Sequence, residues 1–168
     1  MKKTAGIGLW ILTLSLVSGM SRARGDANPG FDKLRMLVGE WEGKDAQEKP
    51  VRVSYKMVSA GTALLETLSP GGESEMVTIY TMDGDAVALT HYCSANNQPR
   101  MRTVPNAGDP NELDFTFVGA TNLADPGVGH MHRLAITIQD GDHFTQEWTW
   151  RERGKADTIE IFRFTRKK

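Results

Sequence analysis

Three short runs of the sequence hold side chain types that bind ligands or take part in catalysis in other proteins. His130 and His132 are two residues apart, so on a β-strand both would point to the face that Leu134 continues. His91 and Cys93 have the same spacing and would also share a face. A zinc site needs three or four such ligands, and no further cysteine or acidic cluster completes a recognised spacing. We therefore predict no metal site and no catalytic residue, and the histidines are left with hydrogen bonding or acid–base roles.

Arg100 and Arg102 would share one face of the extended segment that begins at Pro99. On the outer face of a sheet the two arginines would form a solvated stripe. On an inner face they would need anionic partners, because a buried unpaired charge is very costly. The partner would be either the carboxylate of a bound ligand or a glutamate of the chain. The glutamates that could serve are Glu66, Glu147 and Glu160.

Aromatic residues alternate with polar ones near the C-terminus, and Trp148 and Trp150 fall on one strand face. Core packing is the usual role of such rings, and the wall of a ligand cavity is the alternative. For a small apolar or amphipathic ligand, including one that carries a carboxylate, we predict six contact residues. These are His91, Arg100, Arg102, His132, Trp148 and Trp150.

The elements that position these residues are predicted to be ten short strands. Phe31, Leu34 and Leu37 are spaced for one or two helical turns, after which apolar residues recur at every second position. Tight-turn sequences such as Asp83-Gly84 separate the strand-like runs. The expected strands lie at about 38–45, 51–59, 63–69, 75–82, 85–94, 99–104, 112–119, 130–139, 142–152 and 156–166.

Short connections require neighbouring strands to pair antiparallel. Ten such strands in series form either a sandwich or an up-and-down barrel, and the barrel leaves no exposed sheet edge. We therefore predict an all-β chain, an antiparallel up-and-down β-barrel of about ten strands with a short N-terminal helix.

The first 23 residues have the layout of a secretory signal peptide. Lys2 and Lys3 precede an uncharged run over residues 5–17, which is shorter than the roughly 20 residues of a membrane span. An uncleaved anchor or a buried helix is the alternative. We expect a signal peptide at 1–23, a flexible lead-in at 24–30 and a barrel domain at 31–168. The mature chain would then be exported to the periplasm or the cell exterior, with no stable membrane span.

Charge and cysteine content bound the partners and the compartment. The chain has 20 basic and 21 acidic residues, and loss of residues 1–23 removes three basic ones, which leaves a net charge of about −4. This gives no basic surface for nucleic acid or an anionic membrane. Cys93 is the only cysteine, so no disulfide can form within the chain. Its thiol is either a small buried apolar group or a reactive one.

The sequence around Trp41 resembles the opening of lipocalin-like and nitrobindin-like barrels, the calycin group. In those proteins a short helix runs into Gly-x-Trp-x-Gly on the first strand, as Gly39, Trp41 and Gly43 do here. A second region is similar to exported bacterial proteins of unknown function with a lipocalin-like barrel. It reads Tyr80-Thr81-Met82-Asp83-Gly84-Asp85, then Leu89-Thr90-His91-Tyr92-Cys93 and Asn97-Gln98-Pro99-Arg100-Met101. The resemblance implies a calycin-like barrel whose tryptophan closes one end and whose glycines let the first strand bend.

The nitrobindin-like barrels bind haem through a histidine close to the C-terminus. Here the last histidine is His143, and residues 144–168 contain none. We therefore expect no haem and no other cofactor. The favoured function is an exported barrel that binds a small apolar or amphipathic ligand. The alternatives are a packed structural or interaction barrel, and a barrel enzyme of the isomerase or cyclase type or a haem protein.

Overall fold

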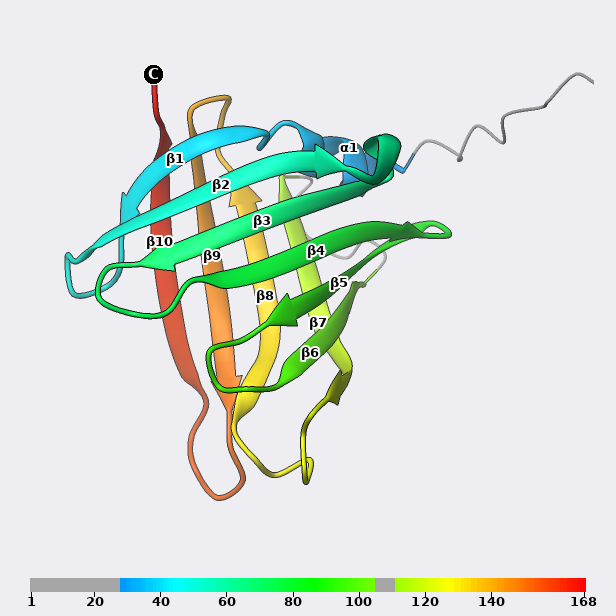
Figure 1. Ribbon diagram of the computed structural model, residues 1–168, viewed down its shortest axis with the longest axis vertical. Coiled ribbons are helices and arrows are strands. Elements are labelled where there is room, and N and C mark those ends of the chain that lie inside the picture. Colours follow the sequence, from blue (N-terminus) through cyan, green and yellow to red (C-terminus); the bar gives the residue numbers. More distant parts are fainter. Residues whose placement is uncertain (1–27, 105–110) are drawn as a thin grey trace, which may run out of the picture.

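The computed structural model describes residues 28–104 and 111–168, which form a closed ten-stranded antiparallel barrel preceded by one short helix (Figure 1). Each strand pairs with its neighbours in the sequence, and β10 closes the barrel against β1. The predicted fold class is confirmed. The predicted signal peptide, and the lead-in as far as residue 27, lie outside the described residues.

The elements follow the predicted strands closely. They are α1 (Pro29–Arg35), β1 (Gly39–Lys44), β2 (Pro50–Val58), the 3-10 turn η1 (Ser59–Gly61), β3 (Ala63–Pro70), β4 (Met76–Asp83), β5 (Ala86–Tyr92), β6 (Gln98–Thr103), β7 (Glu112–Thr121), β8 (His130–Ile138), β9 (His143–Arg151) and β10 (Thr158–Arg166). No helix among the described residues is long and apolar enough to cross a bilayer.

Helix α1 covers one end of the barrel, which we call the helix end. It begins at Pro29, one residue after its cap Asn28, so the last three residues of the predicted lead-in belong to the helix and its cap. The Asn28 side chain accepts a hydrogen bond from the Phe31 amide (3.1 Å) and donates one to the carbonyl of Ala86 at the start of β5 (3.0 Å). Phe31 and Leu34 are fully buried. The cap therefore fixes the helix to the barrel as well as starting it.

Trp41 closes the helix end from inside the barrel. Its indole N–H donates to the Leu37 carbonyl (2.7 Å), and its ring meets the edge of Phe144 with ring centres 4.7 Å apart. The Arg166 guanidinium lies 4.0 Å from the Trp41 ring centre and donates to the carbonyls of Met36 and Val38. The last strand is thereby tied to the linker between α1 and β1. This is the closure that the resemblance implied for the tryptophan.

Gly43 lets β1 approach β10 closely. It pairs with Phe164, and a Cβ at this position would overlap the carbonyl oxygen of Arg163 and lie 2.7 Å from the Phe164 ring. No side chain fits between the two backbones. The glycine is therefore required by the seam that closes the barrel.

We expect Gly43→Ala to lower the free energy of unfolding by about 2 kcal/mol, because the added methyl group forces the seam apart. Urea denaturation measures the change. Gly141→Ala is the matched control, since a Cβ there meets no atom within 4 Å. That variant should stay within about 0.5 kcal/mol of the unmodified protein. Equal stability of the two variants would contradict this account of the seam.

Candidate functional site

The centre of the barrel holds a fully buried carboxylate, that of Glu66 on β3. One of its oxygens accepts hydrogen bonds from the Tyr80 hydroxyl (2.7 Å) and the Gln146 amide (2.8 Å). The other accepts from the Thr78 hydroxyl (3.1 Å). The same Gln146 amide nitrogen also donates to the Tyr55 hydroxyl (2.7 Å). All of these partners are uncharged, and we call the five residues the lumen network.

Strand register explains why the network forms. Tyr55, Glu66, Thr78 and His91 are direct cross-strand neighbours on β2, β3, β4 and β5, so their side chains make one continuous row on the inner face. Gln146 reaches this row from β9, 80 residues away in the sequence from Glu66. Its side-chain carbonyl is used as well, since it accepts from the Trp148 indole N–H (3.2 Å).

Burial raises the pKa of Glu66, while hydrogen bonds from Tyr55, Tyr80, Thr78 and Gln146 act in the opposite direction. Burial and the neighbouring Glu66 also raise the pKa of both tyrosines well above the usual value. Because the pKa of the folded Glu66 carboxyl is raised, its contribution to stability is greatest at acidic pH and falls as the pH rises through that pKa. The tyrosines stay neutral and keep their hydrogens as donors.

His91 continues the network toward Trp148. Its Nδ1 lies 2.9 Å from the Thr78 hydroxyl oxygen, and its ring centre lies 4.5 Å from that of Trp148. The side chain is 1% exposed, and its Nε2 has no hydrogen-bond partner among the described residues. Burial lowers the pKa of His91 to about 4, so the ring is neutral at pH 7. A buried polar atom without a partner is costly, so in a native protein it requires an explanation, and a bound group is one.

At the other end of the barrel the inward-facing side chains are only partly buried. We call this the loop end; its connections are β1–β2, β3–β4, β5–β6, β7–β8 and β9–β10, and the last two lie at the bottom of Figure 1. The partly buried residues there are Cys93, Met131, Trp150 and Glu160. Burial, followed by the charges of Glu73 and Asp45, raises the pKa of Glu160. Burial also raises the pKa of the Cys93 thiol, which favours the neutral form over a reactive thiolate.

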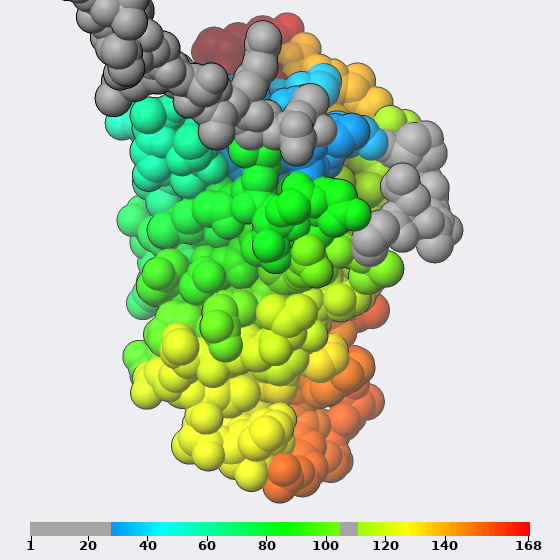
Figure 2. Space-filling view, turned by 90° about the vertical axis from the view of Figure 1, so that its right-hand side faces the viewer, coloured from blue at the N-terminus to red at the C-terminus, as the bar shows by residue number. Residues whose placement is uncertain are grey.

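The β7–β8 connection packs against this end (Figure 2, yellow beside the orange β9–β10 connection). Asn97 donates from its side-chain amide to the Gly129 carbonyl (3.0 Å), and a Cβ on Gly129 would overlap the Trp150 ring. The Arg153 amide donates to the Gly127 carbonyl (3.0 Å). Asn97 is 1% exposed, and its Oδ1, like His91 Nε2, has no partner among the described residues.

A β-bulge changes the direction of the histidine pair that the sequence placed on the inner face. Leu134 pairs with Trp148 and Met131 with Trp150, so β8 has one more residue than β9 between these pairs, and His132 lies in the bulge. Met131 takes the inward position instead and packs against the core. The bulge therefore breaks the alternation that the expectation relied on, while His130 is 3% exposed and both histidine rings lie against Phe117.

The rim histidines form a hydrogen-bonded chain. His130 Nδ1 lies 2.8 Å from the Val128 carbonyl, and its Nε2 lies 3.2 Å from His132 Nδ1. His132 Nε2 lies 2.6 Å from the Arg151 guanidinium, which also makes two hydrogen bonds to Asp157. Both rings are therefore occupied by protein partners. Within the described residues no group of three His, Cys, Asp or Glu side chains could hold a metal ion.

The structure separates the six predicted ligand contacts. His91 and Trp148 meet in the lumen, Trp150 lines the loop end, and His132 sits in the rim chain. Arg100 and Arg102 are exposed on the outer face, because the intervening Met101 is fully buried. Arg102 pairs with Asp83 (2.9 Å), and of the two orientations that the sequence leaves open, the structure has the outward one.

The sequence does not predict the side chains that form hydrogen bonds with His91 and Trp148. From the sequence, Glu66 is predicted only as a partner for an inward arginine, and Gln146 and Asn97 have no predicted functional role. The signal was a polar residue in an apolar row, as in Leu64-x-Glu66-x-Leu68, where all three side chains are buried. Their partners depend on strand register, which the sequence does not show.

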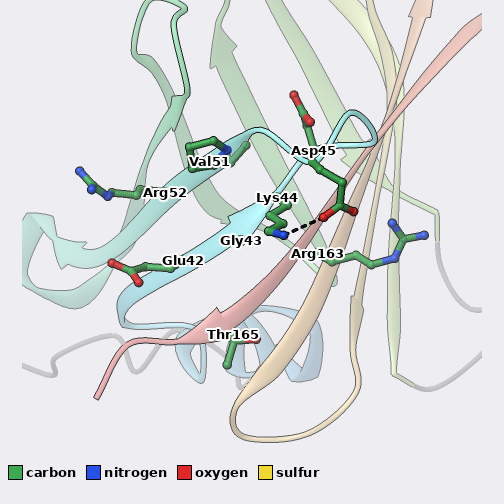
Figure 3. Close-up of a pocket in the computed structure, with 10 residues that line it drawn as sticks. Glu42, Gly43, Lys44, Asp45, Val51, Arg52, Arg163 and Thr165 are labelled. Atoms are coloured by element: carbon green, nitrogen blue, oxygen red, sulfur yellow. Dashed lines mark hydrogen bonds and ion pairs between the residues drawn. The ribbon is translucent and has the colours of Figure 1, made fainter.

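A separate depression of about 530 Å³ lies on the outer surface, where β1, β2 and β10 curve together (Figure 3). Its lining includes charges of both signs, and Lys44 pairs with Glu48 there (2.7 Å). The lining residues are Glu42, Gly43, Lys44, Asp45, Glu48, Pro50, Val51, Arg52, Arg163 and Thr165. None of the six predicted ligand contacts is among them.

Solved structures resemble this barrel at low sequence identity. Rv2717c from M. tuberculosis gives a TM-score of 0.57 at 14% identity, over 85% of this chain and 100% of that chain. A protein of unknown function of the DUF3598 family from Nostoc punctiforme gives 0.46 at 13%, over 80% of this chain and 49% of its own. EF1p2_mFAP2b bound to DFHBI gives 0.34 at 10%, over 80% and 97%. No protein-family model matches this chain, and no curated protein matches its sequence. The likeness to Rv2717c shows the barrel fold alone.

The neutral His91 makes stability depend on pH. The pKa of its ring is about 4 when folded against 6.5 ordinarily, so the unfolded chain takes up the proton first as the pH falls. Unfolding should therefore become easier by about 3 kcal/mol between pH 7 and pH 4 through this group alone. Urea denaturation at both pH values should show His91→Gln losing that much less stability than the unmodified protein.

The control is His143→Gln, which removes an exposed histidine that pairs with Asp140. It should keep the pH dependence of the unmodified protein. If His91→Gln lost as much stability on acidification as the unmodified protein, the buried neutral state of His91 would be refuted.

Proposed function

We propose that the loop end of the barrel binds a small amphipathic molecule. Its apolar part packs on Trp148 and Trp150, and its polar end bonds the Nε2 atom of His91. The observation that carries the proposal is that this nitrogen has no partner among the described residues, on a histidine that is 1% exposed and whose ring lies against Trp148. A bound molecule would supply the missing hydrogen bond.

The exposure of the inward side chains supports the choice of this end. At the helix end the core residues Trp41, Phe144 and Phe164 are at most 2% exposed, so that half is filled by the protein itself. At the loop end the inward-facing Trp150 and Met131 are partly accessible. A ligand there would bury apolar surface that now meets water.

A packed barrel without a ligand is the second candidate. The filled helix end and the closed rim chain favour it, since both bond protein to protein. It requires His91 Nε2 and Asn97 Oδ1 to remain without partners. Export is a further part of the proposal, and it rests on the sequence of residues 1–23.

Three probes with the same chain length test the site: 1-octanol, octylamine and octanoate. We expect at least one of them to change the tryptophan fluorescence saturably, and Trp150→Ala to weaken its binding about tenfold through lost apolar contact. Tyr92→Ala is the matched control, because Tyr92 is an exposed aromatic residue at the end of β5. That variant should bind like the unmodified protein.

Native mass spectrometry of protein purified from its own host provides an independent readout. A retained small molecule that is lost in Trp150→Ala supports the site. No retained molecule, together with no response to any of the three probes, would overturn the proposal in favour of the packed barrel.

A further inference from the structure

Two buried polar atoms near the loop end have no partner among the described residues, and their chemistry indicates what kind of ligand fits. The Thr78 hydroxyl has one hydrogen and gives it to Glu66, so it can only accept from His91. Nδ1 of His91 must then carry the ring hydrogen, and Nε2 is left as a bare lone pair. This tautomer is assigned from the hydrogen-bond network. The unpartnered atom of His91 is therefore an acceptor.

Asn97 adds a second buried acceptor. Its amide nitrogen is used by the Gly129 carbonyl, and its Oδ1 is the atom without a partner. Asn97 and Cys93 are joined through their backbones, since the Cys93 amide donates to the Asn97 carbonyl (3.2 Å). Cys93 is two residues beyond His91 on the same inner face. The two acceptors thus come from β5 and from the β5–β6 connection.

Glu160 brings negative charge to the opposite side. It pairs with Trp148 across β9 and β10, and Trp148 is the ring that contacts His91. Its carboxylate is half-buried and is close enough to Cys93 to raise the pKa of that thiol. Asp45 and Glu73 add to the same negative field. Two arginines of this end are already engaged, because Arg151 pairs with Asp157 and Arg153 with Asp125.

We propose that the ligand of the loop end carries a cationic hydrogen-bond donor, such as an alkylammonium or amidinium group, and not a carboxylate. The inference rests on the proposed function, and it specifies the chemistry of the ligand. An ammonium group has hydrogens for acceptors such as His91 Nε2 and Asn97 Oδ1, and its charge is opposite to that of Glu160. A carboxylate would bring acceptors to acceptors and a negative charge to Glu160.

Isothermal titration calorimetry at pH 7 with octylamine, 1-octanol and octanoate tests the charge preference. We expect octylamine to bind about tenfold more tightly than 1-octanol, and octanoate to bind most weakly. Glu160→Gln should reduce the preference for octylamine over 1-octanol by about tenfold. Glu160 is half-buried at a barrel end, and a urea denaturation curve confirms that the variant folds.

Glu40→Gln is the matched control, because it removes the same charge from an exposed position on β1. It should leave the affinities for all three probes unchanged. Tightest binding of octanoate, or an octylamine preference that Glu160→Gln does not reduce, would overturn the inference while the binding site stands. Failure of all three probes to bind would overturn the proposed site itself.

Discussion

A carboxylate buried among uncharged partners is the constraint on which the interior of this barrel depends. An ion removed from water costs several kcal/mol unless hydrogen bonds replace its hydration, and Glu66 therefore requires every donor around it. Tyr80, Thr78 and Gln146 each give a hydrogen to it. Once those hydrogens are committed, Gln146 can offer only its carbonyl to Trp148, and Thr78 can only accept from His91. One acid in the lumen thus sets the orientation of the polar groups on both sides of it.

The two ends of the barrel differ in how far the protein itself fills them. Trp41, Arg166 and Gly43 hold the first and last strands together, and the core side chains of the helix end are almost fully buried. At the loop end the inward side chains are partly accessible, and two buried acceptors have no partner among the described residues. The lumen network lies between the two ends and separates the filled half of the barrel from the loop end. A ligand that occupies the loop end would complete the hydrogen bonding that the chain leaves open.

Period-two patterning and turn sequences predict the ten strands, and the spacing of Phe31, Leu34 and Leu37 predicts the helix. The closing role of the tryptophan is implied by the resemblance to the calycin barrels. Patterning also placed Arg100 and Arg102 on a common face, but only their neighbour Met101, which is fully buried, shows that this face is the outer one. The bulge at His132 could not be predicted, because one extra residue in a strand leaves no mark on local alternation. The partners of Glu66 come from strands far apart in the sequence. They follow from register and barrel closure, which are properties of the whole fold.

Nitrogen-15 NMR of the His91 imidazole at pH 7 tests directly whether Glu66 fixes the direction of the hydrogen bonds in the lumen. If Glu66 commits the Thr78 hydrogen, His91 must carry its hydrogen on Nδ1, and Nε2 must show the shift of an unprotonated nitrogen. In Glu66→Gln the new amide can donate to Thr78, whose own hydrogen then turns to His91, and the ring hydrogen should move to Nε2. A hydrogen on Nε2 in the unmodified protein would contradict the account, because the lumen would then offer a donor and not an acceptor.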